Sequence, residues 1–108
     1  MITKEIYIGS ESQKQKVVAW DINGNGCNVT NDTTLIKLNN PNKSELYFIY
    51  GGTEGQRITI YADDKSYTMK YSSGQNNSAI KPNPKQDKLI ERYNQITVIK
   101  VNGAWYEI

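Results

Sequence analysis

The sequence predicts an all-β fold. Apolar residues alternate with polar residues at a period of two in several short segments, as expected of strands with one buried face. β-Branched and aromatic residues are concentrated in the same segments, and turn-forming Asn-Gly and Gly-Gly pairs lie between them. About seven or eight short strands separated by such turns indicate a compact antiparallel β-sandwich or a β-prism-like domain.

The expected strands follow one another with little between them except turns. Residues 46–50 are continuously apolar and are expected to form the most buried strand. Asn102 and Gly103 suit the positive φ angles of a tight hairpin, and Gly51 and Gly52 form a further turn. Residues 72–83 are polar and contain proline, which cannot donate to a β ladder, so a long loop is predicted there. The expected strands are residues 2–8, 17–20, 34–38, 46–50, 57–61, 67–71, 96–101 and 105–108, with one further brief strand at residues 79–80 within the loop region.

The chain is long enough for one domain but contains few apolar side chains. Its 108 residues fall within the size of a single domain. Only 37% of them are hydrophobic, and that share includes eight tyrosines and one phenylalanine. A domain with so little apolar material often completes its burial against copies of itself, so self-association is expected. A small monomeric sandwich is the alternative.

Charge, cysteine and histidine content argue against several functional classes. The net charge is +2 with both signs interspersed, so no nucleic-acid partner is expected. No histidine occurs, and the single Cys27 can form neither an internal disulfide nor a thiol pair for a metal. No apolar run approaches the ~18 residues of a membrane span, so membrane insertion is not expected. We expect no catalytic residues, no metal and no cofactor, and therefore no enzyme.

Two acidic motifs have a chemical and a structural interpretation. The segment that begins at Asp21 reads DINGNG like the start of a calcium loop, and Asp32 falls at its twelfth position. That position normally carries a bidentate glutamate, and the flanking segments look like strands, so a glycine-rich connection without calcium is preferred. Asp63 and Asp64 could be paired catalytic carboxylates, but Lys65 follows them, and a solvated turn is preferred.

Tyrosines in the expected strands also have two possible roles. They could form an exposed platform on which sugar rings stack, or they could occupy half-buried positions at a subunit interface. We favour the interface and keep a carbohydrate-binding β-sandwich module with a tyrosine stacking surface as the alternative. The tyrosines concerned are Tyr47, Tyr50, Tyr61, Tyr67 and Tyr71.

Two motifs in the second half of the chain point to a family. The first is GGTEGQRITI and the second is the ending GAWYEI. In this order they resemble the C-terminal tip domains of bacteriophage fibre and tailspike proteins, which commonly carry GG-x-x-G-Q-x-I-T-I and finish on W-Y-E-I. The residues before position 46 resemble no family. The matching positions are Gly51, Gly52, Gly55, Gln56, Ile58, Thr59, Ile60, Gly103, Trp105, Tyr106, Glu107 and Ile108.

The resemblance implies a bacteriophage virion structural protein without chemistry of its own. Its fold would be a fibre domain in which three chains form an intertwined homotrimer. Such a small fibre would be a head fibre, a capsid decoration protein or a tail fibre, made in the bacterial host cytoplasm and displayed on the virion. Its function would be adhesion to the host or to surface glycans.

The composition of the first residues indicates a division of the chain into two parts, because one isolated apolar strand, residues 2–8, is followed by a polar, linker-like stretch at residues 10–16. Residues 1–20 would attach the trimer to other virion proteins of the capsid or tail, and residues 21–108 would form the trimeric domain. The expected attachment residues are Ile2, Ile6 and Ile8. The expected residues of the trimer interface or tip fold are Tyr47, Tyr50, Ile58, Ile60, Trp105, Tyr106 and Ile108.

Overall fold

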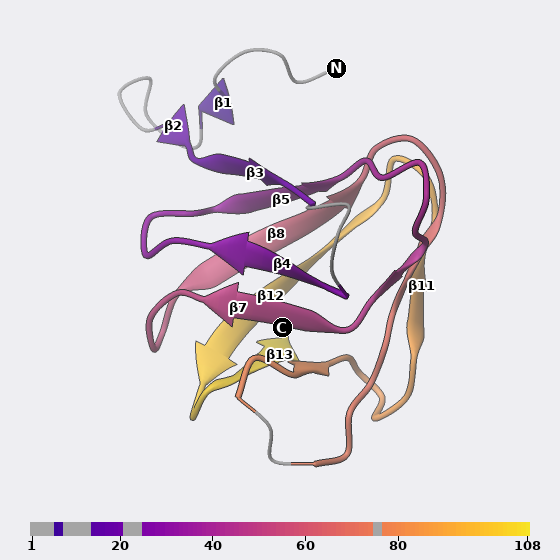
Figure 1. The fold of residues 1–108 in the computed structure, drawn as a ribbon. Helices are drawn as coiled ribbons and strands as arrows, with labels where there is room; N and C mark the ends of the chain where they lie inside the picture. The colour runs from indigo at the N-terminus through magenta and orange to yellow at the C-terminus, as the bar shows by residue number, and fades with distance from the viewer. Residues whose placement is uncertain (1–5, 8–13, 21–24, 75–76) are drawn as a thin grey trace.

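The predicted all-β class is confirmed. The computed structural model describes residues 6–7, 14–20, 25–74 and 77–108, which contain thirteen strands and no helix (Figure 1). Within these residues, no helix has the length and apolar character needed to cross a bilayer. In chain order the strands are β1 (Ile6–Tyr7), β2 (Lys14–Gln15), β3 (Val17–Ala19), β4 (Gly26–Val29), β5 (Leu35–Leu38), β6 (Glu45–Leu46), β7 (Phe48–Gly51), β8 (Arg57–Ala62), β9 (Tyr67–Met69), β10 (Ile80–Lys81), β11 (Lys88–Ile90), β12 (Gln95–Val101) and β13 (Ala104–Glu107).

The described residues between positions 17 and 69 wind into stacked coils. β3, β5 and β8 lie side by side as parallel strands, with Val17 opposite Leu35 and Leu35 opposite Thr59. Between these strands the chain crosses to other sides of the core, where β4 pairs with β7 and β6 pairs with β9, again in parallel. Parallel neighbours need such crossovers, because a tight turn joins only antiparallel strands. The stacking is therefore solenoid-like (Figure 1).

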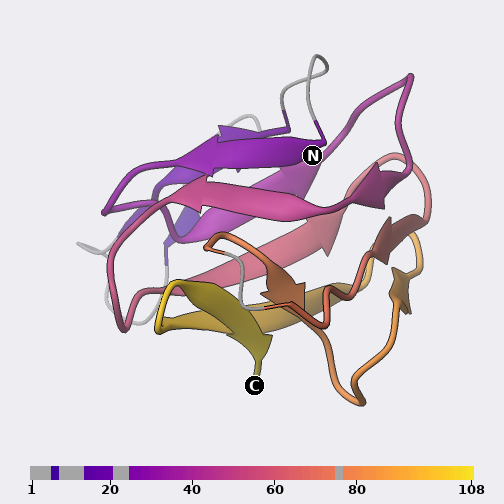
Figure 2. The same ribbon diagram turned by 60° about the horizontal axis from the view of Figure 1, so that its bottom comes forward.

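The end of the chain closes this stack with antiparallel strands. β12 pairs with β8, and β13 folds back on β12 through a hairpin turn at Asn102 and Gly103. Their φ angles of 52° and 86° confirm the predicted tight turn. β10 pairs in parallel with β13, which completes a six-stranded sheet in the order β10-β13-β12-β8-β5-β3 (Figure 2).

The predicted antiparallel arrangement is only partly correct. Among the described residues, five of the nine strand pairings are parallel. Side chains alternate between faces in both kinds of sheet, so alternation in the sequence does not reveal the direction of the partner strand. The turn at residues 63–65 connects β8 and β9, which lie in different sheets and therefore do not form a hairpin.

Three strands were not predicted: β2, β4 and β11. The glycine and asparagine residues around β4 indicated a connection, yet Cys27 and Val29 of this strand are buried in the core. β11 contributes only Ile90 to the core, so it has no apolar alternation for the sequence to reveal. Short strands of this kind are specified by their neighbours rather than by their own composition.

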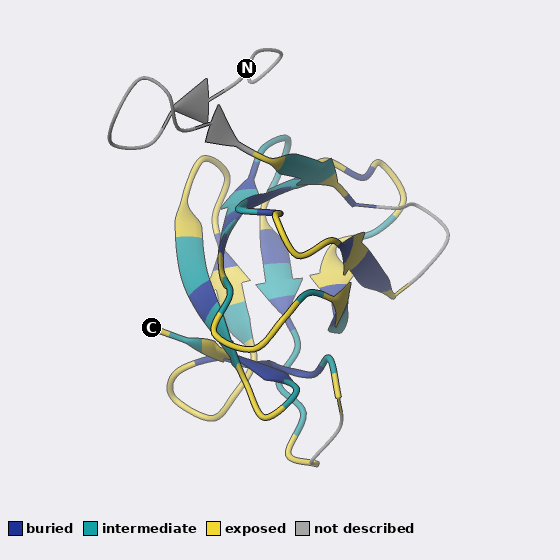
Figure 3. Cartoon of the chain, turned by 90° about the vertical axis from the view of Figure 1, so that its left-hand side faces the viewer, coloured by how far each residue is buried: buried dark blue, intermediate teal, exposed yellow. Residues whose placement is uncertain are grey.

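The core lies between the sheets and is continuous within one chain. Inward-facing residues of adjacent strands align in rows, with Ile36 opposite Ile60 and Ile60 opposite Ile96. Figure 3 shows buried positions alternating with half-buried or exposed ones along the strands. Low hydrophobic content does not prevent this core, because the few apolar residues occupy inward positions. The largest fully buried side chains are Trp105, Tyr67, Ile36, Leu38, Leu46, Ile49, Ile58, Ile60, Met69, Ile80, Ile90 and Val98.

Trp105 joins the terminal hairpin to the coils. Its side chain is fully buried, and its indole Nε1 donates a hydrogen bond to the Ile49 carbonyl oxygen at 3.0 Å. Gly52 covers the ring with a φ of 79°, and a Cβ at this position would lie 3.0 Å from two atoms of the indole. Glycine is therefore required both by the backbone conformation and by the close approach of the ring.

Polar side chains of the same loop hold the hairpin in place. The Gln56 side-chain amide donates to the Thr33 carbonyl oxygen at 2.7 Å. The Glu54 carboxylate accepts hydrogen bonds from the backbone N–H groups of Gly103 and Asn102, at 2.9 and 2.7 Å. These bonds favour the ionised form and lower the pKa of Glu54. The GGTEGQ and GAWYEI motifs are therefore in contact in the folded chain.

Replacing Trp105 with alanine should destabilise the protein strongly. The substitution removes a buried aromatic and leaves the Ile49 carbonyl oxygen without its donor, so we expect a loss of about 3–5 kcal/mol in the free energy of unfolding. Gly52→Ala should destabilise in the same direction because of the indole above it. Urea unfolding followed by circular dichroism measures both effects. Tyr106→Ala is the control, because this neighbouring aromatic side chain is exposed. Equal losses of unfolding free energy for Trp105→Ala and Tyr106→Ala would show that burial of the indole does not stabilise the fold.

Tyr67 anchors the side of the core formed by β6, β9 and β11. Its ring contacts Trp20 edge-on, with the ring centroids 5.7 Å apart. Its hydroxyl donates to Asp64 Oδ1 and accepts from the Asn40 backbone N–H, each at 2.6 Å. Burial, followed by the hydrogen bond to Asp64, raises the pKa of Tyr67 above its ordinary value of 10.0.

The raised pKa of Tyr67 predicts a loss of stability in alkali. The folded chain retains this proton to higher pH than the unfolded chain. The stabilisation is therefore complete below pH 10.0, the ordinary value for tyrosine, and declines as the pH rises toward the raised pKa. Tyr67→Phe should lower stability at neutral pH by about 1–3 kcal/mol and flatten the alkaline decline. Urea unfolding between neutral and alkaline pH tests this, with the exposed Tyr106→Phe as control. An alkaline decline unchanged in Tyr67→Phe would show that other groups cause it.

Candidate functional site

The residues predicted for the trimer interface or tip fold divide into two groups. Ile58, Ile60 and Trp105 are fully buried within the single chain and belong to its core. Tyr50 and Tyr106 are 42% and 43% exposed, and Tyr47 is half-buried. Ile108 is 59% exposed at the end of the chain. Only the second group presents surface to another molecule, and its role in an interface remains a prediction.

The predicted attachment residues fall at the beginning of the chain. Ile2 and Ile8 lie outside the described residues, and Ile6 is placed in β1, which pairs antiparallel with β2. Further along the same segment, Val17–Ala19 pair with β5, and Trp20 is buried against Tyr67. Residues 17–20 thus contribute to the sheet and core of the folded domain.

The tyrosines weighed as a stacking platform do not share one surface. Tyr67 is buried, and Tyr61 is half-buried on β8. The rings of Tyr47 and Tyr50 both contact Phe48, with centroid distances of 6.4 and 5.7 Å. Tyr71 is separate from these and lies beside β10 and β13.

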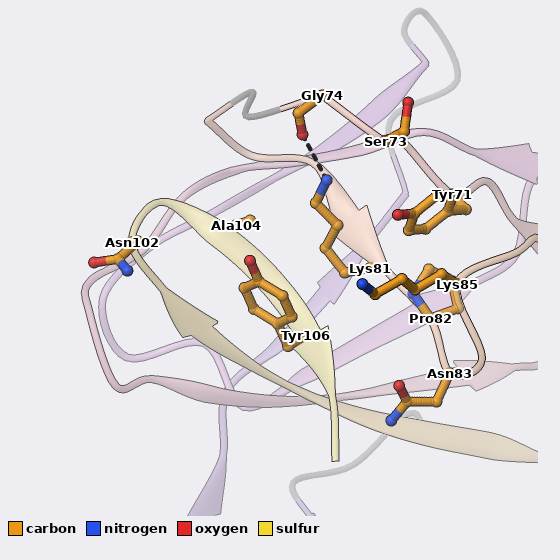
Figure 4. Close-up of a pocket in the computed structure, with 10 residues that line it drawn as sticks. All are labelled: Tyr71, Ser73, Gly74, Lys81, Pro82, Asn83, Lys85, Asn102, Ala104 and Tyr106. Carbon is orange, nitrogen blue, oxygen red and sulfur yellow. Dashed lines mark hydrogen bonds between the residues drawn. The ribbon is translucent and has the colours of Figure 1, made fainter.

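A positively charged hollow lies over the edge of the six-stranded sheet, and we call it the basic hollow (Figure 4). Its volume is about 310 Å³, near the lower end for small-molecule sites. Lys81 on β10 and Tyr106 on β13 are directly opposite in register, so their side chains lie on one face of the sheet. Ala104, two residues before Tyr106, lies on that same face and leaves room for the hollow. Its lining residues are Tyr71, Ser73, Gly74, Lys81, Pro82, Asn83, Lys85, Asn102, Ala104 and Tyr106.

Lys81 organises the centre of the basic hollow. Its ammonium donates to the carbonyl oxygens of Ser72 and, at 2.5 Å, Gly74, so the side chain is held in place from the loop (Figure 4). The same ammonium lies 5.3 Å from the centroid of the Tyr71 ring. Because an ammonium has three donors, one N–H of Lys81 remains for a ligand.

Asn83 lines the basic hollow and is held in place by Glu107, which lies outside it. The Asn83 backbone N–H donates to Glu107 Oε1 at 2.8 Å, and its side-chain Nδ2 donates to the Glu107 carbonyl oxygen at 3.1 Å. This arrangement leaves Asn83 Oδ1 to accept from a ligand. Glu107 is itself paired with Lys88 at 2.6 Å, so its negative charge is balanced outside the hollow.

A second, more open hollow carries exposed apolar side chains among polar and charged ones, and we call it the apolar hollow after the former. It lies between the loop after β11 and the end of β13, with a volume of about 650 Å³. Leu89 and Tyr93, which are 56% and 60% exposed, line it together with Ile96 and Ile108. Exposed apolar side chains gathered in one place indicate a contact surface for another molecule.

The chemical motifs considered in the sequence lie apart from both hollows. Asp21 falls outside the described residues, while Asp32 accepts a hydrogen bond from Thr30 Oγ1 at 2.5 Å. Asp63 accepts from Asn39 and Asp64 from Tyr67, so the two carboxylates have separate structural partners. Among the described residues, no group of three or more His, Cys, Asp or Glu is placed to hold a metal ion.

The sequence signals for the basic hollow were weak. Lys81, Asn83 and Lys85 lie in or next to a segment expected to be a polar loop, and nothing in their spacing specifies β13 as their neighbour. The parallel pairing of β10 with β13 brings them to Tyr106. Two lysines flank two prolines in Lys81-Pro82-Asn83-Pro84-Lys85, which is the one local hint of a rigid basic segment.

Comparisons with protein-family models, with curated proteins and with solved structures found no match for this chain. Its function is therefore argued from its own surface.

Proposed function

We propose that this chain is a bacteriophage virion structural protein that assembles as a small homotrimeric fibre and mediates adhesion. The observation that carries the proposal is the distribution of exposed apolar residues. Of the six large hydrophobic side chains exposed among the described residues, three line the apolar hollow together. These three are Leu89, Tyr93 and Ile108.

The apolar hollow is the proposed contact between copies. Its charged lining residues are Lys88, Glu91 and Glu107, and Lys88 is already paired with Glu107. Little uncompensated charge therefore opposes burial, and the exposed Leu89 and Tyr93 would gain most from it. In a trimer, each domain would bury this surface against two further copies. In a monomer, the same apolar side chains would stay exposed to water, so the surface favours the fibre.

The segment before the coils is the proposed attachment to other virion proteins of a capsid or tail. β1 and β2 form a two-stranded sheet apart from the three sheets around the core. A two-stranded sheet is only marginally stable by itself, and its edges can pair with a strand of another protein. The proposed attachment segment is residues 1–15, because residues 17–20 serve the fold.

A carbohydrate-binding module is the second candidate function. The observation that favours it is the basic hollow, where Tyr71 and Tyr106 lie beside polar and charged groups. Glycan adhesion is compatible with both functions. The oligomeric state separates them, because a trimer supports the fibre and a folded monomer supports the module.

Leu89→Asp should convert the protein to a folded monomer. Charge placed in the apolar hollow would be desolvated in the trimer but not in the free chain. Sedimentation equilibrium should give three times the chain mass of 12.3 kDa for the original protein and one times this mass for the variant. Val101→Asp, an exposed position outside the hollow, should remain trimeric. A cooperatively folded monomer in the original protein at micromolar concentration would refute the trimer.

Removing residues 1–15 should prevent virion attachment without preventing assembly. A chain that begins at Lys16 keeps β3 and Trp20, and therefore keeps the first coil and the core contact with Tyr67. We expect this chain to sediment as a trimer but to be absent from purified particles, as measured by quantitative mass spectrometry. Incorporation equal to that of the full chain would place the attachment elsewhere.

A further inference from the structure

We propose that the basic hollow binds an acidic saccharide, a sugar with a ring carboxylate of the uronic-acid kind. The inference rests on the adhesive part of the proposed function and specifies its site and ligand class. Two ammonium groups, from Lys81 and Lys85, line the hollow, and none of the described residues that line it carries a carboxylate side chain.

The local charges favour an anionic ligand. Lys85 is exposed and has no ion-pair partner among the described residues, and Figure 4 shows its side chain directed into the space beside Tyr106. The nearby acids are engaged elsewhere, since Asp87 pairs with Lys70 at 2.7 Å and Glu107 pairs with Lys88. The charge of Lys85 is thus available to a ligand carboxylate.

The aromatic and polar groups favour a sugar over a simple anion. In Figure 4 the rings of Tyr71 and Tyr106 lie on either side of the Lys81 side chain. Tyrosine presents an apolar face with a polar tip, which suits a sugar ring that is apolar on its C–H face and polar at its rim. The free Asn83 Oδ1 and the spare N–H of Lys81 provide one acceptor and one donor for ring hydroxyls.

A nucleic acid fits the same hollow less well. Single-stranded binders combine stacking with a continuous basic groove along the backbone. Here the positive charge is confined to Lys81 and Lys85 within one small hollow, and the net charge of the chain is only +2. A short oligosaccharide needs no more charge than this.

The test compares two trisaccharides that differ in their carboxylates. Trigalacturonic acid and galactotriose are titrated separately into the full-length ¹⁵N-labelled chain, and amide shifts are followed by NMR. We expect the acidic sugar to shift residues 81–85 and 104–106, with weaker binding at higher salt. The neutral sugar should bind several-fold more weakly. Polyphosphate and a short oligothymidylate are titrated as the competing anion classes.

Matched variants locate the site. Lys85→Glu should weaken binding of trigalacturonic acid by about fivefold or more, because it replaces an attractive charge with a repulsive one. Tyr106→Ala should weaken it about fivefold through lost stacking. Lys16→Glu makes the same charge change at an exposed lysine outside the hollow, and Tyr50→Ala removes a similarly exposed tyrosine. Both controls should bind as the original chain does. Circular dichroism verifies that each variant is folded.

Several outcomes would overturn the inference. These are no binding of trigalacturonic acid, equal binding of galactotriose, binding unaffected by Lys85→Glu and Tyr106→Ala, or equally tight binding of polyphosphate or oligothymidylate. Sedimentation of the same samples separates this inference from the fibre proposal. A trimer that does not bind the saccharide would refute the site but not the fibre. A monomer that binds the acidic sugar at residues 81–85 and 104–106 would support the site and refute the fibre.

Discussion

The burial of Trp105 beneath Gly52 is the contact on which the rest of the structure depends. A stack of parallel coils has an open end whose backbone groups and apolar side chains need covering. The terminal hairpin provides that cover by pairing β12 with β8 and by placing the indole against the turn between β7 and β8. The hydrogen bonds of Glu54 to the backbone of Asn102 and Gly103 fix the same hairpin from outside.

This closure also positions the candidate site. Trp105 lies opposite Ile80 in the pairing of β13 with β10, and both side chains are buried. The next pair in register, Tyr106 and Lys81, must then lie on the opposite face of the sheet, because successive side chains in a strand alternate. The basic hollow is therefore formed by the outer face of the strand pair whose inner face completes the core.

The sequence revealed strands more reliably than it revealed their partners. Alternation located β8, β9 and β12, and Asn102-Gly103 located the terminal turn, since these signals are local. Parallel stacking and the joining of β10 to β13 depend on contacts between distant segments, which the alternation does not encode. The basic hollow was missed for that reason. Conversely, Gly52 and Trp105 were singled out in two separate motifs, and the structure gives them a shared physical role in the core.

The two hollows have different proposed roles, contact between copies and saccharide binding. They are separate on the surface, so one can be buried while the other stays open. The apolar hollow carries Leu89, Tyr93, Ile96 and Ile108 among polar and charged residues, whereas the basic hollow is lined from β10, β13, the turn before β13 and the loops beside β10. Glu107 lies between them, with one carboxylate oxygen bonded to Asn83 and the other to Lys88. The Glu107 carboxylate balances the charge of Lys88 beside the apolar hollow. Among the described residues, Lys85 has no such ion-pair partner. Burial of the apolar surface between copies would therefore leave the charged surface exposed for a ligand.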